Sequence, residues 1–364
     1  MNSSTSGTGS APGGTPWSTD HPVLEALRRR REKGHSPDAP TDDLKIGLAV
    51  EGGGIRGVVS AAMLCALEDL DLISSFDAVY SASSGAINSA YFLNGDTWYP
   101  LSIYYDDLAT RKFVDFRRVL RGQILDLDYA FQVVDSVKPL DYEAVIDSPT
   151  KLHVAVTLVD ELRTEAVTDF TSRADLRAAL VASAWLPVAL RGTTDFRGRR
   201  ALDGGVLTPH PYRLALQDGC THVLSLSTRP IQPPRQKLSL SQRYAIRHLN
   251  RIRAGLGAAH GAAIARYRAE RRTLQRRMAE PGEAPFVLDI APLSWMPQVK
   301  RHEIDSGRIL AGARGAYEVM YCAIEGRDPE LIRAGRLRAV PQLTMVAKHE
   351  DGKRADVAPH RRPD

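Results

Sequence analysis

The stretch that decides the fold is Phe76-Asp77-Ala78-Val79-Tyr80-Ser81-Ala82-Ser83-Ser84-Gly85-Ala86-Ile87-Asn88-Ser89-Ala90. A short apolar run rich in aromatic and β-branched residues meets a cluster of small side chains, and a segment compatible with a helix follows at 86–93. This pattern predicts a strand, a tight turn and a helix, a shape that exposes the central serine beside a helix amino terminus. Ser83 is therefore a candidate nucleophile, with Ser81 and Gly85 as its small neighbours. The alternative is a small-residue turn that serves packing alone.

A glycine-rich loop, Glu51-Gly52-Gly53-Gly54-Ile55-Arg56-Gly57, follows a predicted strand at 44–50 and leads into a helical pattern at 58–70. Glycines in such a loop let backbone amides approach an anionic oxygen closely. The spacing also matches a dinucleotide-binding fingerprint, which expects an acidic residue at the end of the next strand. Here that strand runs into Ser81, and its acidic residue, Asp77, lies at its beginning. A nucleotide-binding module built on Gly52–Gly57 stays as an alternative function.

An aspartate in a glycine turn, Asp203-Gly204-Gly205, follows a predicted short strand at 199–202. Upstream of it, the pattern predicts a strand at 152–158, a pairing strand at 164–170 and a helix at 176–184. We expect the glycine loop, the serine turn and the aspartate turn to lie at the same edge of a parallel sheet, where open α/β folds bind ligands. The combination favours one site over three unrelated turns.

The length and composition of the chain are compatible with this fold and indicate the cellular compartment. The 364 residues allow one large α/β domain with appendages or two domains, and the net charge of +5 is modest. Three cysteines without metal-ligand spacing, Cys65, Cys220 and Cys322, indicate buried thiols in a reducing compartment. No apolar run approaches the ~18 residues of a membrane span, and the first residues do not resemble a secretory signal. We expect a soluble cytoplasmic protein whose membrane contact, if any, is peripheral.

The amino-terminal segment 1–43 is expected to contain a disordered tail, a short basic helix and a linker. Residues 1–19 are dominated by Ser, Thr, Gly and Pro, which cannot bury enough surface to order the chain. A helix at 23–33 carries the run Arg28–Arg31, for which a solvated face is predicted and an anionic surface contact is the alternative. The folded domain is expected to begin near Leu44.

With these three motifs in order, the chain resembles the patatin-like phospholipases over residues 44–229. In that family a Gly-Gly-Gly-x-Arg-Gly loop supplies the oxyanion hole, which corresponds here to Gly52, Gly53, Gly54, Arg56 and Gly57. The nucleophile elbow corresponds to Ser81–Gly85, and the aspartate motif to Asp203, Gly204 and Gly205. The resemblance implies a three-layer α/β fold with a mainly parallel central sheet, helices on both faces and, in this chain, a helical carboxyl-terminal extension. Ser81 replaces the first glycine of the elbow, which leaves a catalytically impaired interaction protein as a further alternative.

The resemblance also implies acyl transfer from a phospholipid or related lipid ester, without a metal or an organic cofactor. Ser83 would attack the ester carbonyl and Asp203 would accept its proton. The amides of Gly53 and Gly54 would hold the developing oxyanion, and Arg56 would support the loop. An ordinary triad would need a histidine after the aspartate, for which His210 and His222 are the candidates; a loop or core role is expected for His210.

The carboxyl-terminal third, 230–340, is expected to be a helical extension that packs on the catalytic domain. A linker at 230–234 precedes a long helical pattern at 241–278, which has ten arginines and a single acidic residue, Glu270. A basic amphipathic helix fits an anionic membrane surface, but packing on the domain is favoured, and nucleic-acid binding is not expected. A strand at 285–290, a closing helix at 303–324 and a loose polar tail at 341–364 complete the chain.

Overall fold

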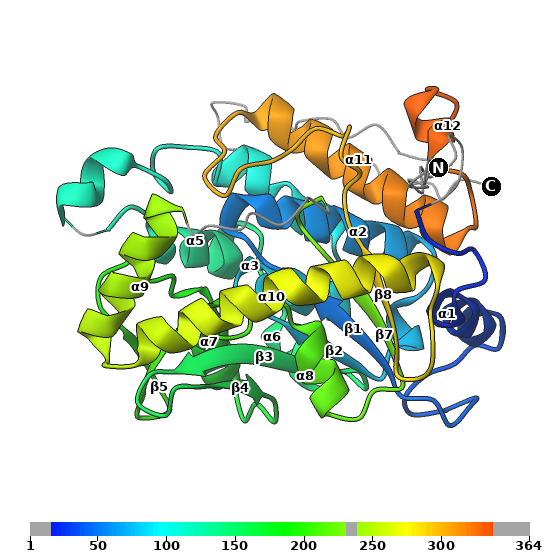
Figure 1. The fold of residues 1–364 in the computed structure, drawn as a ribbon, viewed down its shortest axis with the longest axis horizontal. Helices are drawn as coiled ribbons and strands as arrows, with labels where there is room; N and C mark the ends of the chain where they lie inside the picture. Colours follow the sequence, from blue (N-terminus) through cyan, green and yellow to red (C-terminus); the bar gives the residue numbers. More distant parts are fainter. Residues whose placement is uncertain (1–15, 122, 231–238, 338–364) are drawn as a thin grey trace, which may run out of the picture.

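The computed structural model describes residues 16–121, 123–230 and 239–337. Within them the chain forms three layers, a central sheet with helices packed on both faces (Figure 1). This architecture confirms the predicted α/β fold with a mainly parallel sheet. The tails expected at 1–15 and 341–364, and most of the linker expected at 230–234, lie outside the described residues.

The central sheet has eight strands in the order β5-β6-β3-β2-β1-β7-β8, with β4 paired to β3 off this path. Five strands, β3, β2, β1, β7 and β8, are parallel, whereas β4, β5 and β6 pair antiparallel with their neighbours. A parallel sheet covered on both faces favours strands that are apolar throughout, as β1 is. The strands are β1 (Ile46–Val50), β2 (Ala78–Ser81), β3 (Lys151–Leu158), β4 (Arg163–Val167), β5 (Thr194–Phe196), β6 (Arg199–Asp203), β7 (His222–Leu226) and β8 (Phe286–Ile290).

Helices cover the sheet from two sides. On one face, strand residues such as Leu48 and Leu224 pack with α2, α3, α7 and α11, and on the other face Ala49 and Val223 pack with α8 and α10. The helices are α1 (Pro22–Glu32), α2 (Val58–Asp69), α3 (Ser84–Leu93), α4 (Trp98–Leu101), α5 (Leu127–Gln132), α6 (Tyr142–Ile146), α7 (Arg173–Ala184), α8 (Tyr212–Gln217), α9 (Leu240–Ile252), α10 (Leu256–Ala279), α11 (Ser306–Ile324) and α12 (Glu330–Arg333). Short 3-10 turns include Gly54–Gly57 and Gly204–Val206, and single π turns lie at Ile103–Asp107 and Val133–Val137.

The folded core begins before the boundary expected at Leu44. Trp17 is 1% exposed, and Val23, Leu24 and Leu27 of α1 are fully buried in the main cluster. The backbone amide of Ser18 also donates to the carbonyl of Met278, 2.8 Å away. The amino-terminal helix is therefore part of the domain's core.

The prediction of a solvated face for Arg28–Arg31 is wrong for most of that run. Arg30 is completely buried, and its guanidinium pairs with Asp42 at 2.8 Å and with Asp77 at 2.9 Å. Arg28 donates to the carbonyl of Ile324, Arg31 pairs with Glu325, and Arg29 is exposed. Burying the Arg30 charge is tolerable because two carboxylates and two backbone carbonyls satisfy it. Arg30 therefore holds α1 against the start of β2, and Arg28 and Arg31 hold it against the end of α11.

The carboxyl-terminal segment is built into the same sheet. β8 pairs in parallel with β7 over its whole length, and α11 packs against α2 and has eleven buried residues. The expected boundary at residue 229 therefore falls between two neighbouring strands. The predicted strand at 285–290 and the predicted closing helix are both confirmed as elements.

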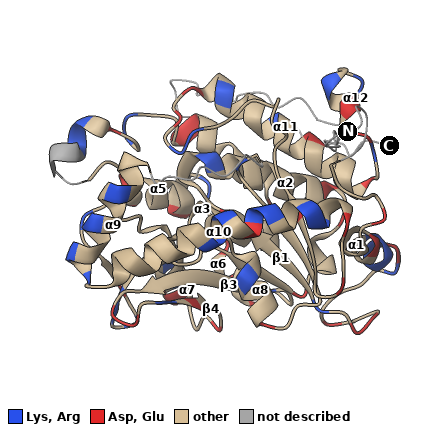
Figure 2. Cartoon of the chain, viewed as in Figure 1, with Lys and Arg blue, Asp and Glu red and all other residues tan. Residues whose placement is uncertain are grey.

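The basic pattern at 241–278 forms two helices instead of one. Gly255, with a φ of +88°, reverses the chain between α9 and α10, and Ile246 lies against Gly257 and Gly261 in the antiparallel pair. α10 lies across the sheet (Figure 1), and both helices carry exposed positive charge (Figure 2), at Arg243, Arg247 and Arg251 of α9 and at Arg266, Arg272 and Arg276 of α10. No helix in the described ranges is both long and apolar enough to cross a membrane.

Candidate active site

Two strand ends meet on one edge of β3. Ser81, the last residue of β2, lies opposite Val154, and Asp203, the last residue of β6, lies opposite Val156. Since β4 pairs with β3 from Val154 to Leu158, it occupies the other edge of that strand. β2 and β6 therefore share an edge of β3 and approach each other end to end. This topology brings Ser83, two residues past β2, next to Asp203.

The prediction that the aspartate turn follows a parallel strand is wrong. β6 runs antiparallel to β3, so Asp203 reaches the serine turn from the opposite direction. The outcome for the site is the same, because both strand ends stop at nearly the same level of β3. Strand direction depends on pairing partners elsewhere in the chain, and the short pattern at 199–202 does not contain that information.

Ser83 has the strained geometry of a sharp strand-to-helix turn. Its φ of 58° and ψ of −139° are unusual for a residue with a side chain, and α3 begins at the next residue. The Ser83 amide donates to Ser183 Oγ at 2.9 Å, and the Ser183 hydroxyl donates to the carbonyl of Ala155 at 2.7 Å. α7 and β3 therefore hold the turn in place, and the positive end of the α3 dipole lies beside the Ser83 hydroxyl.

Ser81 is accommodated without crowding the turn. It is fully buried at the end of β2 and keeps its strand pairing with Val50 and Val154. Its hydroxyl has no hydrogen-bond partner among the described residues, although it is shielded from solvent. A buried hydroxyl of this kind costs stability. Serine in place of the family's glycine thus affects folding free energy more directly than it affects the shape of the elbow.

Asp203 is a buried carboxylate with few compensating partners. It is 3% exposed, its Oδ1 accepts a hydrogen bond from the Gly205 amide at 2.7 Å, and its side chain also interacts with the Ser83 hydroxyl. Burial raises the pKa of Asp203 to about 6, although the hydrogen bonds from Ser83 and Gly205 and the charge of Arg301 oppose the shift. Gly204 lies so close to the Ala155 carbonyl that no Cβ fits there. The glycine turn therefore fixes the carboxylate against β3.

The glycine loop interlocks with the serine turn. A Cβ on Gly52 would lie 2.8 Å from Ser83 Cβ and 2.9 Å from the Gly85 amide nitrogen. A Cβ on Gly85 would lie 2.6 Å from the Val50 carbonyl oxygen, and one on Gly57 would lie 2.7 Å from the Tyr104 hydroxyl. Side chains are thus excluded at Gly52 and Gly85 because two backbone segments touch there, whereas at Gly57 the side chains of Ser84 and Tyr104 occupy the space. The structure brings the predicted loop and the predicted turn together as one unit.

The two amides expected to bind an oxyanion differ in their surroundings. The Gly53 amide donates to Ser84 Oγ at 2.9 Å, so it already has a partner. The Gly54 amide has no partner among the described residues, and the φ of +62° at Gly54 requires a glycine. Gly54 is therefore the freer donor of the two.

A buried polar network supports the loop from behind, and sequence reasoning missed most of it. Glu51 is 4% exposed and accepts from the Thr228 amide at 2.7 Å, from Arg229 and from Tyr267 on α10. Burial alone would raise the pKa of Glu51, but the charges of Arg229 and Arg56 outweigh it and hold that pKa at about 2. Arg56 is also buried, with its Nε 3.1 Å from Thr228 Oγ1. The expected supporting role of Arg56 agrees with this placement.

The structure places both candidate histidines away from the serine. His210 is buried with its Nε2 3.0 Å from Ser227 Oγ and 3.5 Å from Asp289, whose partner is Arg271 on α10. His222 lies at the start of β7, at the amino end of the parallel strands, with its Nδ1 2.9 Å from Thr221 Oγ1. Neither histidine contacts Asp203 in the described part of the chain, so both belong to structural clusters.

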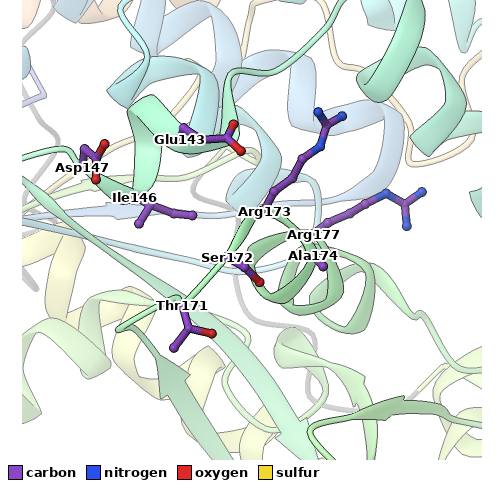
Figure 3. Close-up of a pocket in the computed structure, with 8 residues that line it drawn as sticks. All are labelled: Glu143, Ile146, Asp147, Thr171, Ser172, Arg173, Ala174 and Arg177. Atoms are coloured by element: carbon purple, nitrogen blue, oxygen red, sulfur yellow. The ribbon is translucent and has the colours of Figure 1, made fainter.

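A pocket of about 640 Å³ lies between α6 and the beginning of α7 (Figure 3). Glu143 and Asp147 line one side of it, and Arg173 and Arg177 line the other. The Ser83 turn contacts the far end of α7, at Ser183, eleven residues from Ser172 and so about 16 Å along the helix. This pocket is therefore separate from the Ser83 and Asp203 site.

A comparison with protein families agrees with the resemblance drawn from the sequence motifs. Residues 48–216 match the model of the patatin-like phospholipase family. The uncharacterized protein YjjU of Escherichia coli strain K12 is 25% identical over 192 residues, which are 52% of this chain and 53% of that protein. The chain thus spans about half the length of this curated relative.

Two solved structures align with this chain at 12% sequence identity. VipD from Legionella pneumophila aligns with a TM-score of 0.41 over 78% of this chain and 67% of that chain. Human GIVD cytosolic phospholipase A2, solved in complex with methyl gamma-linolenyl fluorophosphonate and terbium chloride, aligns with a TM-score of 0.40 over 85% and 63%.

Proposed function

From the premise that residues 48–216 form a patatin-like phospholipase domain, we propose that the protein hydrolyses carboxylic ester bonds of phospholipids or related lipids. One observation carries the proposal: the serine turn and the aspartate turn end on the same edge of β3, beside an interlocked glycine loop. Ser83 is the proposed nucleophile and Asp203 the proposed base. Gly52, Gly53, Gly54 and Gly57 form the proposed oxyanion loop, which Arg56 supports.

The proposed reaction proceeds in two acyl transfers. Ser83 Oγ attacks the ester carbonyl carbon while its proton passes to Asp203, and the oxyanion is held by the Gly54 amide and the α3 amino terminus. Collapse of the tetrahedral intermediate breaks the bond to the alcohol, which takes the proton from Asp203. Water then attacks the acyl-serine while Asp203 accepts a proton, and the fatty acid leaves as Ser83 is regenerated.

Burial makes Asp203 a better base than an exposed aspartate. An ordinary aspartate, with a pKa near 3.9, is a weak base toward a hydroxyl. The raised pKa of Asp203, about 6, brings it nearer to the range useful for proton transfer at neutral pH. The same environment leaves the carboxylate mostly ionised above that pH, which the proposed role requires.

We expect kcat/KM for a soluble ester to fall on the acid side with an apparent pKa near 6. Asp203 must be ionised to accept the Ser83 proton, and its raised pKa places the loss of ionisation at about 6. The measurement is a pH profile from 4.5 to 9, with circular dichroism at each pH to exclude unfolding. A profile that stays level down to pH 4.5 in a folded protein would contradict Asp203 as the base.

The direct test of the function is mass spectrometry of lipid products. Wild type incubated with phospholipid and neutral glyceride is expected to release fatty acid and a lysolipid or partial glyceride, and Ser83→Ala is not. A fluorophosphonate probe should label the wild type at Ser83. Tight dinucleotide binding without labelling would instead favour the nucleotide module on Gly52–Gly57, and neither result would favour an impaired interaction protein.

Peripheral membrane contact is proposed for α9. Its arginines Arg243, Arg247 and Arg251 recur every fourth residue and are exposed, next to Leu240 at 83% and Tyr244 at 54% exposure. Exposed cations beside exposed apolar side chains fit an anionic lipid surface. α10 is less suited to this contact, because Arg271 pairs with buried Asp289 and Leu274 packs beneath the helix.

Vesicle flotation tests this contact. We expect wild type to float with vesicles that contain phosphatidylserine and the triple variant R243A/R247A/R251A to remain largely in the bottom fraction. Each cation near an anionic surface contributes about 1 kcal/mol, so three changes should lower binding by roughly a hundredfold at low salt. A matched variant, R272A/R276A, alters exposed arginines of α10 and should float like wild type. Equal flotation of all three proteins would exclude α9 as the membrane contact.

A further inference from the structure

The segment that leads from β8 to α11 passes directly over the glycine loop. The Ile55 amide donates to the Arg301 carbonyl at 3.1 Å, and a Cβ on Gly54 would lie 2.8 Å from the same carbonyl oxygen. We call residues 300–304 the rim loop. Its position is fixed by Val299 and Glu303, which are 5% and 7% exposed.

The rim loop presents positive and apolar side chains to solvent. Lys300, Arg301 and His302 are exposed, Ile304 is 47% exposed, and the ring of Phe116 lies against His302 with its centroid 5.1 Å away. Cations mixed with apolar side chains suit the interface between a lipid's polar group and its chains.

Arg301 differs from the other arginines near the site because its guanidinium has no partner in the described part of the chain. No ion pair or side-chain hydrogen bond joins it to another described residue, whereas nearby Arg308 pairs with Glu303 at 3.4 Å. Arg56 is buried behind the loop and donates to Thr228, and Arg229 pairs with Glu51 at 3.2 Å. The free guanidinium thus belongs to the exposed residue whose backbone touches the glycine loop.

The charge of Arg301 acts on the proposed base, Asp203, and on two other groups near the glycine loop. Its charge lowers the pKa values of Asp203 in the aspartate turn, of Arg56 behind the loop and of His260 on α10, in each case secondary to the effect of burial. Two guanidinium groups that repel each other across the glycine loop create a place where an anion is stabilised. That place adjoins the proposed position of the scissile ester.

We propose that Arg301 binds the phosphate of the substrate, which makes the protein selective for phospholipids over neutral lipid esters. This inference rests on the proposed function. An ester substrate held at Ser83 with its phosphodiester toward solvent would place that anion under the rim loop, where Arg301 donates charge-assisted hydrogen bonds to it. Phe116 and Ile304 would contact the adjoining apolar part of the lipid.

The test compares two short-chain esters dissolved as monomers, a phosphatidylcholine and the diacylglycerol with the same acyl chains. For Arg301→Ala we expect the ratio of phospholipid to diacylglycerol kcat/KM to fall ten- to a hundredfold, mainly through KM, since a charge-assisted hydrogen bond is worth about 1.5–3 kcal/mol. Arg301→Lys should restore part of the ratio. Arg308→Ala, a nearby exposed arginine with its own partner, should leave the ratio unchanged.

Three other outcomes are informative. If Arg301→Ala lowers kcat/KM equally on both esters and shifts the apparent pKa on the acid side of the pH profile, phosphate binding is overturned. Arg301 would then act only through the ionisation of Asp203. A lower ratio on vesicles but an unchanged ratio on monomers would also overturn it and would assign Arg301 to the bilayer surface. Wild type that is inactive on both esters would instead overturn the proposed function itself.

Discussion

Ser83→Ala is expected to lower kcat/KM on a lipid or p-nitrophenyl ester by about 10⁴-fold or more, because it removes the attacking oxygen. Asp203→Asn should cause a comparable loss, since the amide cannot accept the Ser83 proton. The two residues act as one unit, so the double variant should be no slower than either single one. Initial rates with purified proteins, checked by circular dichroism, give the measurement.

The histidines provide the control for this pair. His222→Ala should keep activity within about threefold, because its imidazole lies at the opposite end of the strands and contacts Thr221. His210→Gln keeps a polar group in the buried cluster with Ser227 and Asp289 and should also stay active if it folds. A folded His210 or His222 variant as inactive as Ser83→Ala would exclude the serine–aspartate pair.

The stability of Asp203→Asn separates a chemical role from a structural one. The folded pKa of Asp203, about 6, lies above the unfolded value of 3.8, so folding favours the protonated carboxyl. Its contribution to stability is complete below pH 3.8 and is lost as pH rises through about 6. At pH 8 the buried charge therefore costs on the order of 2–3 kcal/mol, and replacing it should raise the free energy of unfolding. Urea unfolding at pH 8 measures this change.

The sequence was sufficient for the elements that carry the three motifs. A strand before Gly52, a strand before Ser83 and a strand before Asp203 are each defined by a few consecutive residues, and glycine marks the turns where backbones touch. Local patterns of this kind determine where a motif lies on its element. A loop or core role was also expected for His210, which is buried.

The parts that escaped prediction depend on partners far away in the chain. Arg30 is buried because Asp42 and Asp77 meet it, and a run of four arginines gives no sign of that. Glu51 is separated from Tyr267 by 216 positions, and the Arg301 carbonyl reaches Ile55 from a similar distance in sequence. The glycine at position 255 is a local sign that the helical pattern ends there. The reversal of the chain between α9 and α10 depends instead on the packing of α10 against the sheet, which the local pattern does not contain.

Gly52→Ala is expected to lower kcat by about 10²–10³-fold, the effect of losing an oxyanion donor. The new methyl group would collide with the Ala82 carbonyl and would lie 2.8 Å from Ser83 Cβ. Because these neighbours belong to the backbone and the base of the nucleophile, they cannot rotate away, and the glycine loop must move off the serine turn. Overpacking should also cost about 1–3 kcal/mol of unfolding free energy. Single-turnover acylation with a p-nitrophenyl ester isolates the affected step.

Gly261→Ala adds the same methyl group where there is room for it. Its Cβ would lie 3.5 Å from Ile246 Cδ1 of α9, an ordinary contact between the two helices, and alanine favours the helix by up to about 1 kcal/mol. This variant should therefore be as active as wild type and slightly more stable. Both variants replace a glycine with alanine. The difference between the acylation rates of Gly52→Ala and Gly261→Ala therefore reports the fit between the glycine loop and the Ser83 turn. A Gly52→Ala protein that acylates at more than a third of the wild-type rate would mean that the oxyanion is held elsewhere, by amides outside the glycine loop.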